Sequence, residues 1–193
     1  MMGSGGYFSN AGVFLIDVVF GLYIFAVLLR FLFQLVRADF YNPLCQAIVT
    51  VTNPPLRQLR RYIPSLGGLD TASIVLLVVL QMLNTLLVAL VLGLEPGVAG
   101  LLVVALAELL GKTLWTFVGA IIVQVVLSWV APGTYNPLTS VVHSLTEPLL
   151  GPARRAIPPL GPLDLSPLVV LIGLQLAQIL LVAPLRDAGA ALL

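Results

Sequence analysis

The stretch YNPLTSVVHSLTEPLLGPARRAIPPLGPLD, residues 135 to 164, is basic and proline-rich in a chain that is otherwise mostly apolar. Shifting the chain by 94 residues lays YNPL at 41 to 44 on YNPL at 135 to 138, and the match continues without a gap. Nineteen of the 41 positions between Tyr41 and Gln81 are identical to their partners. Chance alignment of two apolar helices would match leucines, but not Asn, Thr, Arg, Pro, Gly and Asp together. The chain therefore contains a duplicated unit of helix, polar loop and helix.

The duplicated loop carries polar, basic and turn-forming residues at the same places in both copies, and we take these as candidate motif positions. In the first copy they are Tyr41, Asn42, Pro43, Thr52, Pro54, Arg60, Arg61, Pro64, Gly67 and Asp70. In the second copy they are Tyr135, Asn136, Pro137, Thr146, Pro148, Arg154, Arg155, Pro158, Gly161 and Asp164.

The composition places the chain in a bilayer. Hydrophobic residues make up 60% of the 193 residues and charged residues only 9%, which leaves too little polar surface to cover a soluble globule. A formal net charge of +1 gives no field that would indicate a nucleic-acid partner. The single cysteine, Cys45, excludes an intrachain disulfide and a cysteine-built metal site.

Four apolar runs are long enough to cross a hydrocarbon core, which takes roughly 20 helical residues. They cover about 11–36, 71–93, 101–130 and 167–185, so that residues 1–93 form the first repeat and 94–193 the second. The first run lacks the basic start and cleavage site of a signal peptide, and we expect it to be retained. Glu108, Gly111 and Lys112 interrupt the third run, whose first part is predicted to extend outside the hydrocarbon.

The expected fold is an all-α membrane protein of four transmembrane helices in two TM-loop-TM repeats. Two spans per repeat make the repeats parallel, so both loops lie on the same side of the membrane. The loops hold most of the arginines, which by the positive-inside rule makes them cytoplasmic and leaves both termini outside.

Each loop is predicted to contain a short amphipathic helix that lies in the membrane interface. Asn42 and Asn136 suit an N-cap that is followed by proline in the first turn, and Pro54 and Pro148 are predicted to end these helices. The apolar face recurs at i, i+4 and i+7. It consists of Leu44, Ile48 and Val51 in the first copy and Leu138, Val142 and Leu145 in the second.

The RRxIP segments after these helices place two guanidinium groups at headgroup depth in each repeat. They suit anionic lipid headgroups or the acidic surface of a protein partner, and a role in topology and anchoring is the simpler interpretation. Asp70 and Asp164, just before the second span of each repeat, are expected to cap that helix or to pair with the repeat arginines.

These motifs resemble those of the YggT family of bacterial integral membrane proteins. The YNP, TxP, RRxIP and GxxD elements occur in order, and the resemblance covers nearly the whole chain. It implies a multi-pass protein of the bacterial inner membrane. Related proteins are associated with tolerance of osmotic shock, and plastid relatives with thylakoid biogenesis, including the attachment of haem to a cytochrome. The family has no agreed catalytic residues to carry over.

Amides inside the spans are also duplicated, since Gln81 and Asn84 match Gln175 and Gln178. Because its members are spaced i, i+3, each pair lies on one helix face. Exposure of these amides to lipid is unfavourable, so this face should meet protein or enclosed water. Interhelical packing is the simpler interpretation and a solute path the alternative. Arg30, which matches Gln124, lies near the cytoplasmic end of its span and is expected to snorkel to the interface.

We expect no enzyme, no cofactor and no metal, because the lone histidine, His143, has no accompanying cluster of ligands at metal spacing. Of three function classes, an enzyme of lipid or cofactor metabolism is therefore the weakest, and two others stay open. One is a membrane scaffold or assembly factor whose basic loops dock lipid and membrane or cytoplasmic proteins. The other is an ion or osmolyte pathway around the duplicated amides, which would need a homo-oligomer because four short spans enclose little space.

Overall fold

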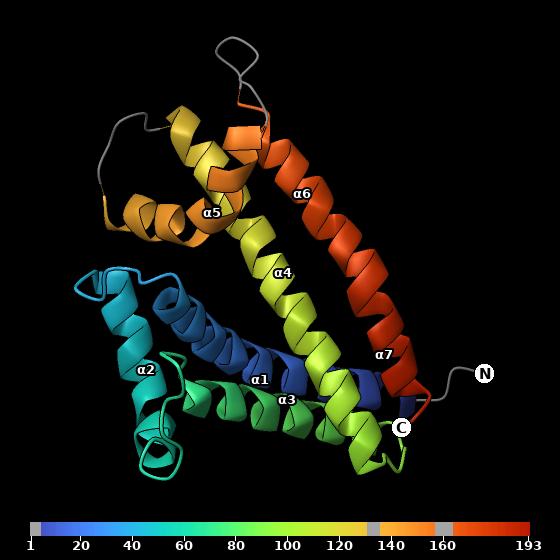
Figure 1. Cartoon of the computed structure of the whole chain (residues 1–193). Helices are drawn as coiled ribbons and strands as arrows, with labels where there is room; N and C mark the ends of the chain where they lie inside the picture. The colour runs from blue at the N-terminus through green and yellow to red at the C-terminus, as the bar shows by residue number, and fades with distance from the viewer. Residues whose placement is uncertain (1–4, 131–135, 157–163) are drawn as a thin grey trace.

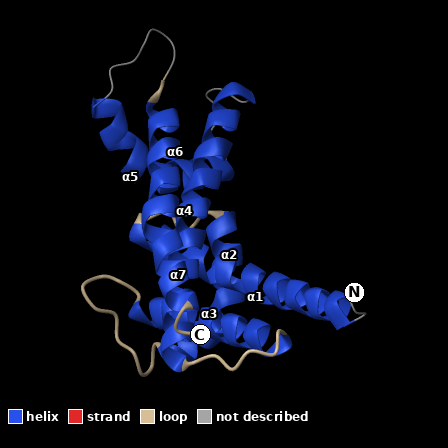
Figure 2. Ribbon diagram, turned by 90° about the vertical axis from the view of Figure 1, so that its right-hand side faces the viewer, coloured by secondary structure: helices blue, strands red, loops and turns tan. Residues whose placement is uncertain are grey.

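The computed structural model describes residues 5–130, 136–156 and 164–193, and every long element in these ranges is a helix (Figure 1). Figure 2 shows the same helices from the side. In chain order the elements are α1 (Gly5–Leu35), α2 (Pro43–Leu59), α3 (Thr71–Val91), α4 (Val98–Val130), α5 (Pro137–Ala156), α6 (Ser166–Ala177), the π-helical turn η1 (Gln178–Val182) and α7 (Ala183–Ala190).

Four helices have the length and the apolar composition to cross a membrane. They cover Gly6–Leu35, Thr71–Val91, Val98–Val130 and Ser166–Ala190, the last through α6, η1 and α7 without a break. The chain is therefore a multi-pass membrane protein. Each predicted run lies largely within one of these helices, although α1 begins earlier than expected and the last helix ends later.

The third span is one unbroken helix through Glu108, Gly111 and Lys112, the residues that interrupt its apolar run. A glycine inside a helix costs roughly 1 kcal/mol relative to alanine. Here the missing side chain makes room for the fourth span, because a Cβ at Gly111 would lie 3.3 Å from Cγ1 of Val182. Close packing between the two spans thus accounts for the glycine.

The prediction that Pro54 and Pro148 end the loop helices is wrong. The helix α2 continues through Pro54 to Leu59, and α5 continues through Pro148 to Ala156. In α2, the residues on either side of the prolines, Thr52 and Leu56, are both fully buried. This packing holds the helix together where proline removes a backbone hydrogen bond. The carbonyl that Pro54 leaves unpaired belongs to the exposed Thr50 and can bond to water.

The spans pack as two pairs, α1 with α3 and α4 with α6, η1 and α7, and the contact between α3 and α4 joins the pairs. In Figure 1 the two pairs diverge toward α2 and α5, which lie at the loop ends of the spans. The larger cluster of buried apolar residues joins α1, α2 and α3 to Val141 and Leu145 of α5. A smaller cluster of Ile121, Leu150 and Leu174 lies between α4, α5 and α6.

Candidate docking face and membrane-embedded polar site

The N-termini of the two loop helices are built as the sequence predicts. The side chain of Asn42 accepts a hydrogen bond from the backbone N–H of Leu44 at 2.9 Å, and that of Asn136 accepts one from Thr139 at 2.8 Å. The Asn42 amide also donates to the carbonyl oxygen of Pro137 at 2.6 Å. The two YNP motifs are therefore in direct contact.

Arg30 holds α2 against the first span. Its guanidinium donates to the hydroxyl of Thr52 at 2.9 Å, to the carbonyl oxygen of Val49 at 3.2 Å and to the side chain of Asn53 at 3.3 Å. The side chain is only 6% exposed, so the expectation that it snorkels to the interface is wrong. Since α2 lies within reach of Arg30 and supplies three acceptors, the charge is satisfied inside the protein.

The second repeat has the same contact without the charge. The Thr146 hydroxyl is hydrogen-bonded to the side chain of Gln124, and these residues lie 94 positions after Thr52 and Arg30. Both threonines are fully buried and also bond back to the carbonyl four residues earlier. A hydroxyl on the loop helix thus meets a polar side chain on the preceding span in each half of the chain.

The first arginine of each RRxIP motif is paired with the aspartate ten residues later. Arg60 contacts the carboxylate of Asp70 through two nitrogens, one of them at 3.4 Å, and the Ser73 hydroxyl also donates to this carboxylate. Asp70 is buried. Burial alone raises the pKa of Asp70, but the hydrogen bonds from Arg60 and Ser73 outweigh it and hold the pKa below its ordinary value.

A glycine turn brings Asp70 back to Arg60. Gly67 and Gly68 have φ of +60° and +83°, a conformation that favours glycine. Leu66 and Leu69, on either side, exchange backbone hydrogen bonds of 3.3 and 3.0 Å, as in a two-residue hairpin. The positive φ therefore explains why the motif has glycine at position 67.

The matching pair in the second repeat is more exposed. Arg154 donates to Asp164 at 3.0 Å and to Glu147 at 3.0 Å, and Asp164, which precedes the N-cap residue Leu165, accepts the backbone N–H of Ser166 at 2.9 Å. Hydrogen bonding from Ser166 is the main cause that lowers the pKa of Asp164, with Arg154 adding to it against a smaller effect of burial. Pairing with the repeat arginine is therefore confirmed for both aspartates, whereas the N-cap residue of α6 is Leu165.

The second arginine of each motif is exposed. Arg61 follows the end of α2, and Arg155 lies in the last turn of α5. Among the described residues, neither has a carboxylate partner. Each motif thus has one arginine that pairs with an aspartate and one that has no carboxylate partner in the described part of the chain. The other motif positions either fall in the loops just described or, for Tyr135, Pro158 and Gly161, lie outside the described residues.

A polar cavity of about 360 Å³ lies between α1, α3 and α4. The Asn84 amide donates to Asp17 at 3.1 Å, and the Gln81 amide donates to Asn84 at 3.4 Å. Gln81 is 1% exposed, and its side-chain oxygen has no hydrogen-bond partner among the described residues. On the α4 side of the cavity, the Glu108 carboxylate forms an ion pair with Lys112 at 3.4 Å. It forms a second ion pair, at 2.8 Å, with Arg186, which does not line the cavity. The sequence predicted the amides, but not that Asp17 would join them.

The amides of the fourth span are separated from one another. Gln178 donates to the carbonyl oxygen of Gly111 at 2.9 Å, which repeats the contact of Asn84 with Asp17 at an offset of 94 residues. Gln175, the partner of the buried Gln81, is exposed on the surface of α6. The prediction that these amides meet protein is thus confirmed for Gln81, Asn84 and Gln178, but within a single chain it is wrong for Gln175.

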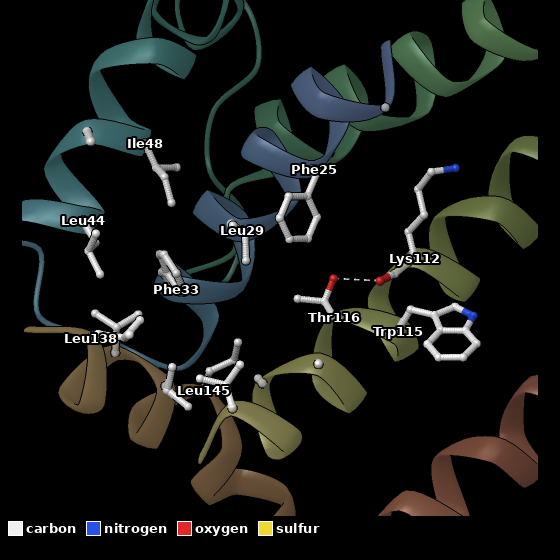
Figure 3. Close-up of a pocket in the computed structure, with 17 residues that line it drawn as sticks. Phe25, Leu29, Phe33, Leu44, Ile48, Lys112, Trp115, Thr116, Leu138 and Leu145 are labelled. Carbon is white, nitrogen blue, oxygen red and sulfur yellow. Dashed lines mark hydrogen bonds between the residues drawn. The ribbon is translucent and has the colours of Figure 1, made fainter. Parts of the chain in front are cut away.

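An apolar cavity of about 720 Å³ lies between α1 and α2 of the first repeat and α4 and α5 of the second. Figure 3 shows Phe25, Leu29 and Phe33 of α1 on one side of it and Leu138, Leu145 and Trp115 of the second half on the other. The regular apolar spacing in α2 and α5 was the only signal in the sequence that pointed to this space.

The comparisons with known proteins agree with these repeated contacts. The family model CCB3/YggT matches the chain twice, over residues 9–91 and 103–185, and the chain belongs to this family. It is 43% identical to an uncharacterised protein of Pseudomonas aeruginosa, with 90% of this chain and 89% of that protein aligned. It is 33% identical to the YggT protein of Escherichia coli, with 95% and 96% aligned. No solved structure matches the chain.

Proposed function

We propose that this protein is a non-enzymatic scaffold or assembly factor of the bacterial inner membrane, acting in envelope function and in tolerance of osmotic stress. The observation that carries the proposal is that the two arginines of each RRxIP motif have different surroundings. Arg60 and Arg154 are held by aspartates, whereas Arg61 and Arg155 are exposed and have no carboxylate partner in the described part of the chain. Two matched, unpaired guanidinium groups suit recognition of phosphate or carboxylate groups.

The proposed topology places both arginines on one face. Two parallel repeats, each a TM-loop-TM unit, put α2 and α5 on the cytoplasmic side and both termini outside, in keeping with the positive-inside rule. In this arrangement α2 and α5 are amphipathic helices of the interface, with Leu44 and Leu138 directed to the apolar cavity. The contact between Asn42 and Pro137 supports a single docking face rather than two independent loops.

The test compares two variants that lose the same charge. Arg61→Ala/Arg155→Ala should abolish the capture of membrane and cytoplasmic partners by crosslinking in native membranes, while insertion and folding stay unchanged. The control, Arg37→Ala/Arg57→Ala, removes two other exposed arginines that lack carboxylate partners in the described residues. Equal partner recovery from both variants and the unmodified protein would contradict the proposal.

A second function, an oligomeric ion or osmolyte pathway, is favoured by the polar cavity. Its supporting observation is Gln81, whose buried side-chain oxygen has no hydrogen-bond partner in the described part of the chain and which lines this cavity together with Asp17 and Lys112. If the cavity conducts, Gln81→Leu/Gln175→Leu should reduce ion or osmolyte flux in proteoliposomes under an osmotic gradient. No flux with the unmodified, inserted protein, while a known channel is active, would eliminate this function and leave the scaffold.

A further inference from the structure

The second spans of the two repeats differ in what covers them. Gln81 of α3 is buried, and its neighbours on that face, Val78 and Thr85, are partly buried. In α6 and η1, the matching Gln175 is exposed, and the flanking residues Ile172 and Ile179 are 53% and 54% exposed. The same face of the repeat is therefore covered in one half and open in the other.

The cover over α3 comes from the next repeat. The helix α3 packs on α1 of its own repeat and also on α4, and the polar cavity beside Gln81 is lined on the α4 side by Val104, Glu108 and Lys112. The helix α6 packs on α4 and α5 of its own repeat, and Figure 1 shows it at the outer edge of the molecule. In a bilayer the amide of Gln175 would then face lipid, which is unfavourable.

The first span has an open face that matches the covering face of α4. The residues 94 positions before Val104, Glu108 and Lys112 are Asn10, Phe14 and Val18 of α1. All three are exposed, and Phe14 is 66% exposed. This face combines apolar side chains with the amide of Asn10, so it can offer both packing and a hydrogen-bond partner to another helix.

We propose that these two open faces bind each other between copies of this chain. The face of α6 and η1 formed by Ile172, Gln175 and Ile179 packs on the face of α1 formed by Asn10, Phe14 and Val18 of a second copy, as α3 packs on α4 within one chain. The internal contact provides the template for the external one. The association is heterologous, because different surfaces meet, and it removes the exposed amide from lipid.

Cysteine crosslinking in native membranes tests this pairing with the full chain in a Cys45→Ala background. Copies with Phe14→Cys and copies with Gln175→Cys, carrying different tags, are produced together and oxidised with copper phenanthroline. We expect a mixed disulfide dimer. The matched control combines Phe8→Cys with Leu181→Cys, two positions in the same antiparallel register as the test pair but on other sides of the two helices, 80% and 57% exposed. The control pair should give at least fivefold less mixed product.

The remaining outcomes overturn the proposal. Equal yields from the test and control pairs would show random collision, with lipid covering both faces. A dimer of Gln175→Cys copies with one another, in place of the mixed product, would indicate a symmetric contact. The result does not depend on the docking or pathway functions, since partner capture and flux are measured separately. A third pair, Asn10→Cys with Ile179→Cys, guards against a folding defect at Phe14 and should also crosslink.

Discussion

The two halves of this molecule use the same contacts with different chemistry. In the first half the loop helix is held by the buried charge of Arg30, and in the second half by the amide of Gln124. The first aspartate, Asp70, is 4% exposed and Asp164 is 46% exposed, although their arginine partners are equally accessible. A duplicated fold therefore keeps the position of each contact while the strength of the contact changes.

This difference indicates which half depends more strongly on polar interactions for its stability. A buried charge or carboxylate must be fully hydrogen-bonded, and loss of one partner leaves an uncompensated group in a medium of low dielectric. An exposed pair can turn to water and is worth little. The first repeat should therefore be more sensitive to polar substitutions than the second, and matched substitutions at an offset of 94 residues measure this directly.

The largest expected effect is at Arg30. Arg30→Leu removes three hydrogen bonds to α2 and should lower the free energy of unfolding by on the order of 2 to 3 kcal/mol, whereas Gln124→Leu should cost about 1 kcal/mol. Arg30→Gln, which copies the second repeat, should recover part of the loss. The measurement is the unfolding midpoint in detergent micelles. Equal losses of stability in Arg30→Leu and Gln124→Leu would show that the two repeats do not differ in the strength of this contact.

The next effect is at the aspartates. Asp70→Asn removes the charge of a buried carboxylate that pairs with the partly exposed Arg60, and it should destabilise the protein by about 1 to 2 kcal/mol. Asp164→Asn should cost less than about 1 kcal/mol, because Asp164 is 46% exposed and asparagine can still accept the backbone N–H of Ser166. Protease sensitivity of the loop between α2 and α3 gives a second readout, and it should increase only in Asp70→Asn.

Acid should weaken the same loops. Both aspartates have a pKa below the ordinary value, so their contribution to stability is complete above about pH 4, the pKa of an unfolded aspartate, and is lost as the pH falls through the lower folded values. The unfolding midpoint between pH 6 and pH 2.5 should fall with acid, and Asp70→Asn/Asp164→Asn should flatten the slope. An unchanged slope would show that other groups cause the acid sensitivity.

Much of this arrangement could be predicted from the sequence because the repeat supplied a second copy of every signal. The spans, the asparagine caps and the pairing of each aspartate with an arginine all followed from residue types at fixed spacing. The course of α2 beyond Pro54 did not, because the burial of Thr52 and Leu56 depends on tertiary packing. The role of Arg30 was missed for the same reason, since its acceptors lie on a different helix.

The smallest effects on folding are expected from substitutions of the two duplicated glutamines, Gln81 and Gln175, and the two substitutions should differ in their consequences. Gln81→Leu removes a weak donation to Asn84 together with an unpaired buried oxygen, and these opposing changes should keep the free energy of unfolding within about 1 kcal/mol. Gln175→Leu should leave the folding of the monomer unchanged, but it should weaken association in the bilayer by about threefold, the typical value of one interhelical hydrogen bond. Unfolding in dilute detergent and crosslinking between Asn10→Cys and Ile179→Cys copies measure the two effects separately. If Gln175→Leu altered unfolding and left crosslinking unchanged, the exposed glutamine would serve its own chain, and the two halves would be more alike than their surfaces indicate.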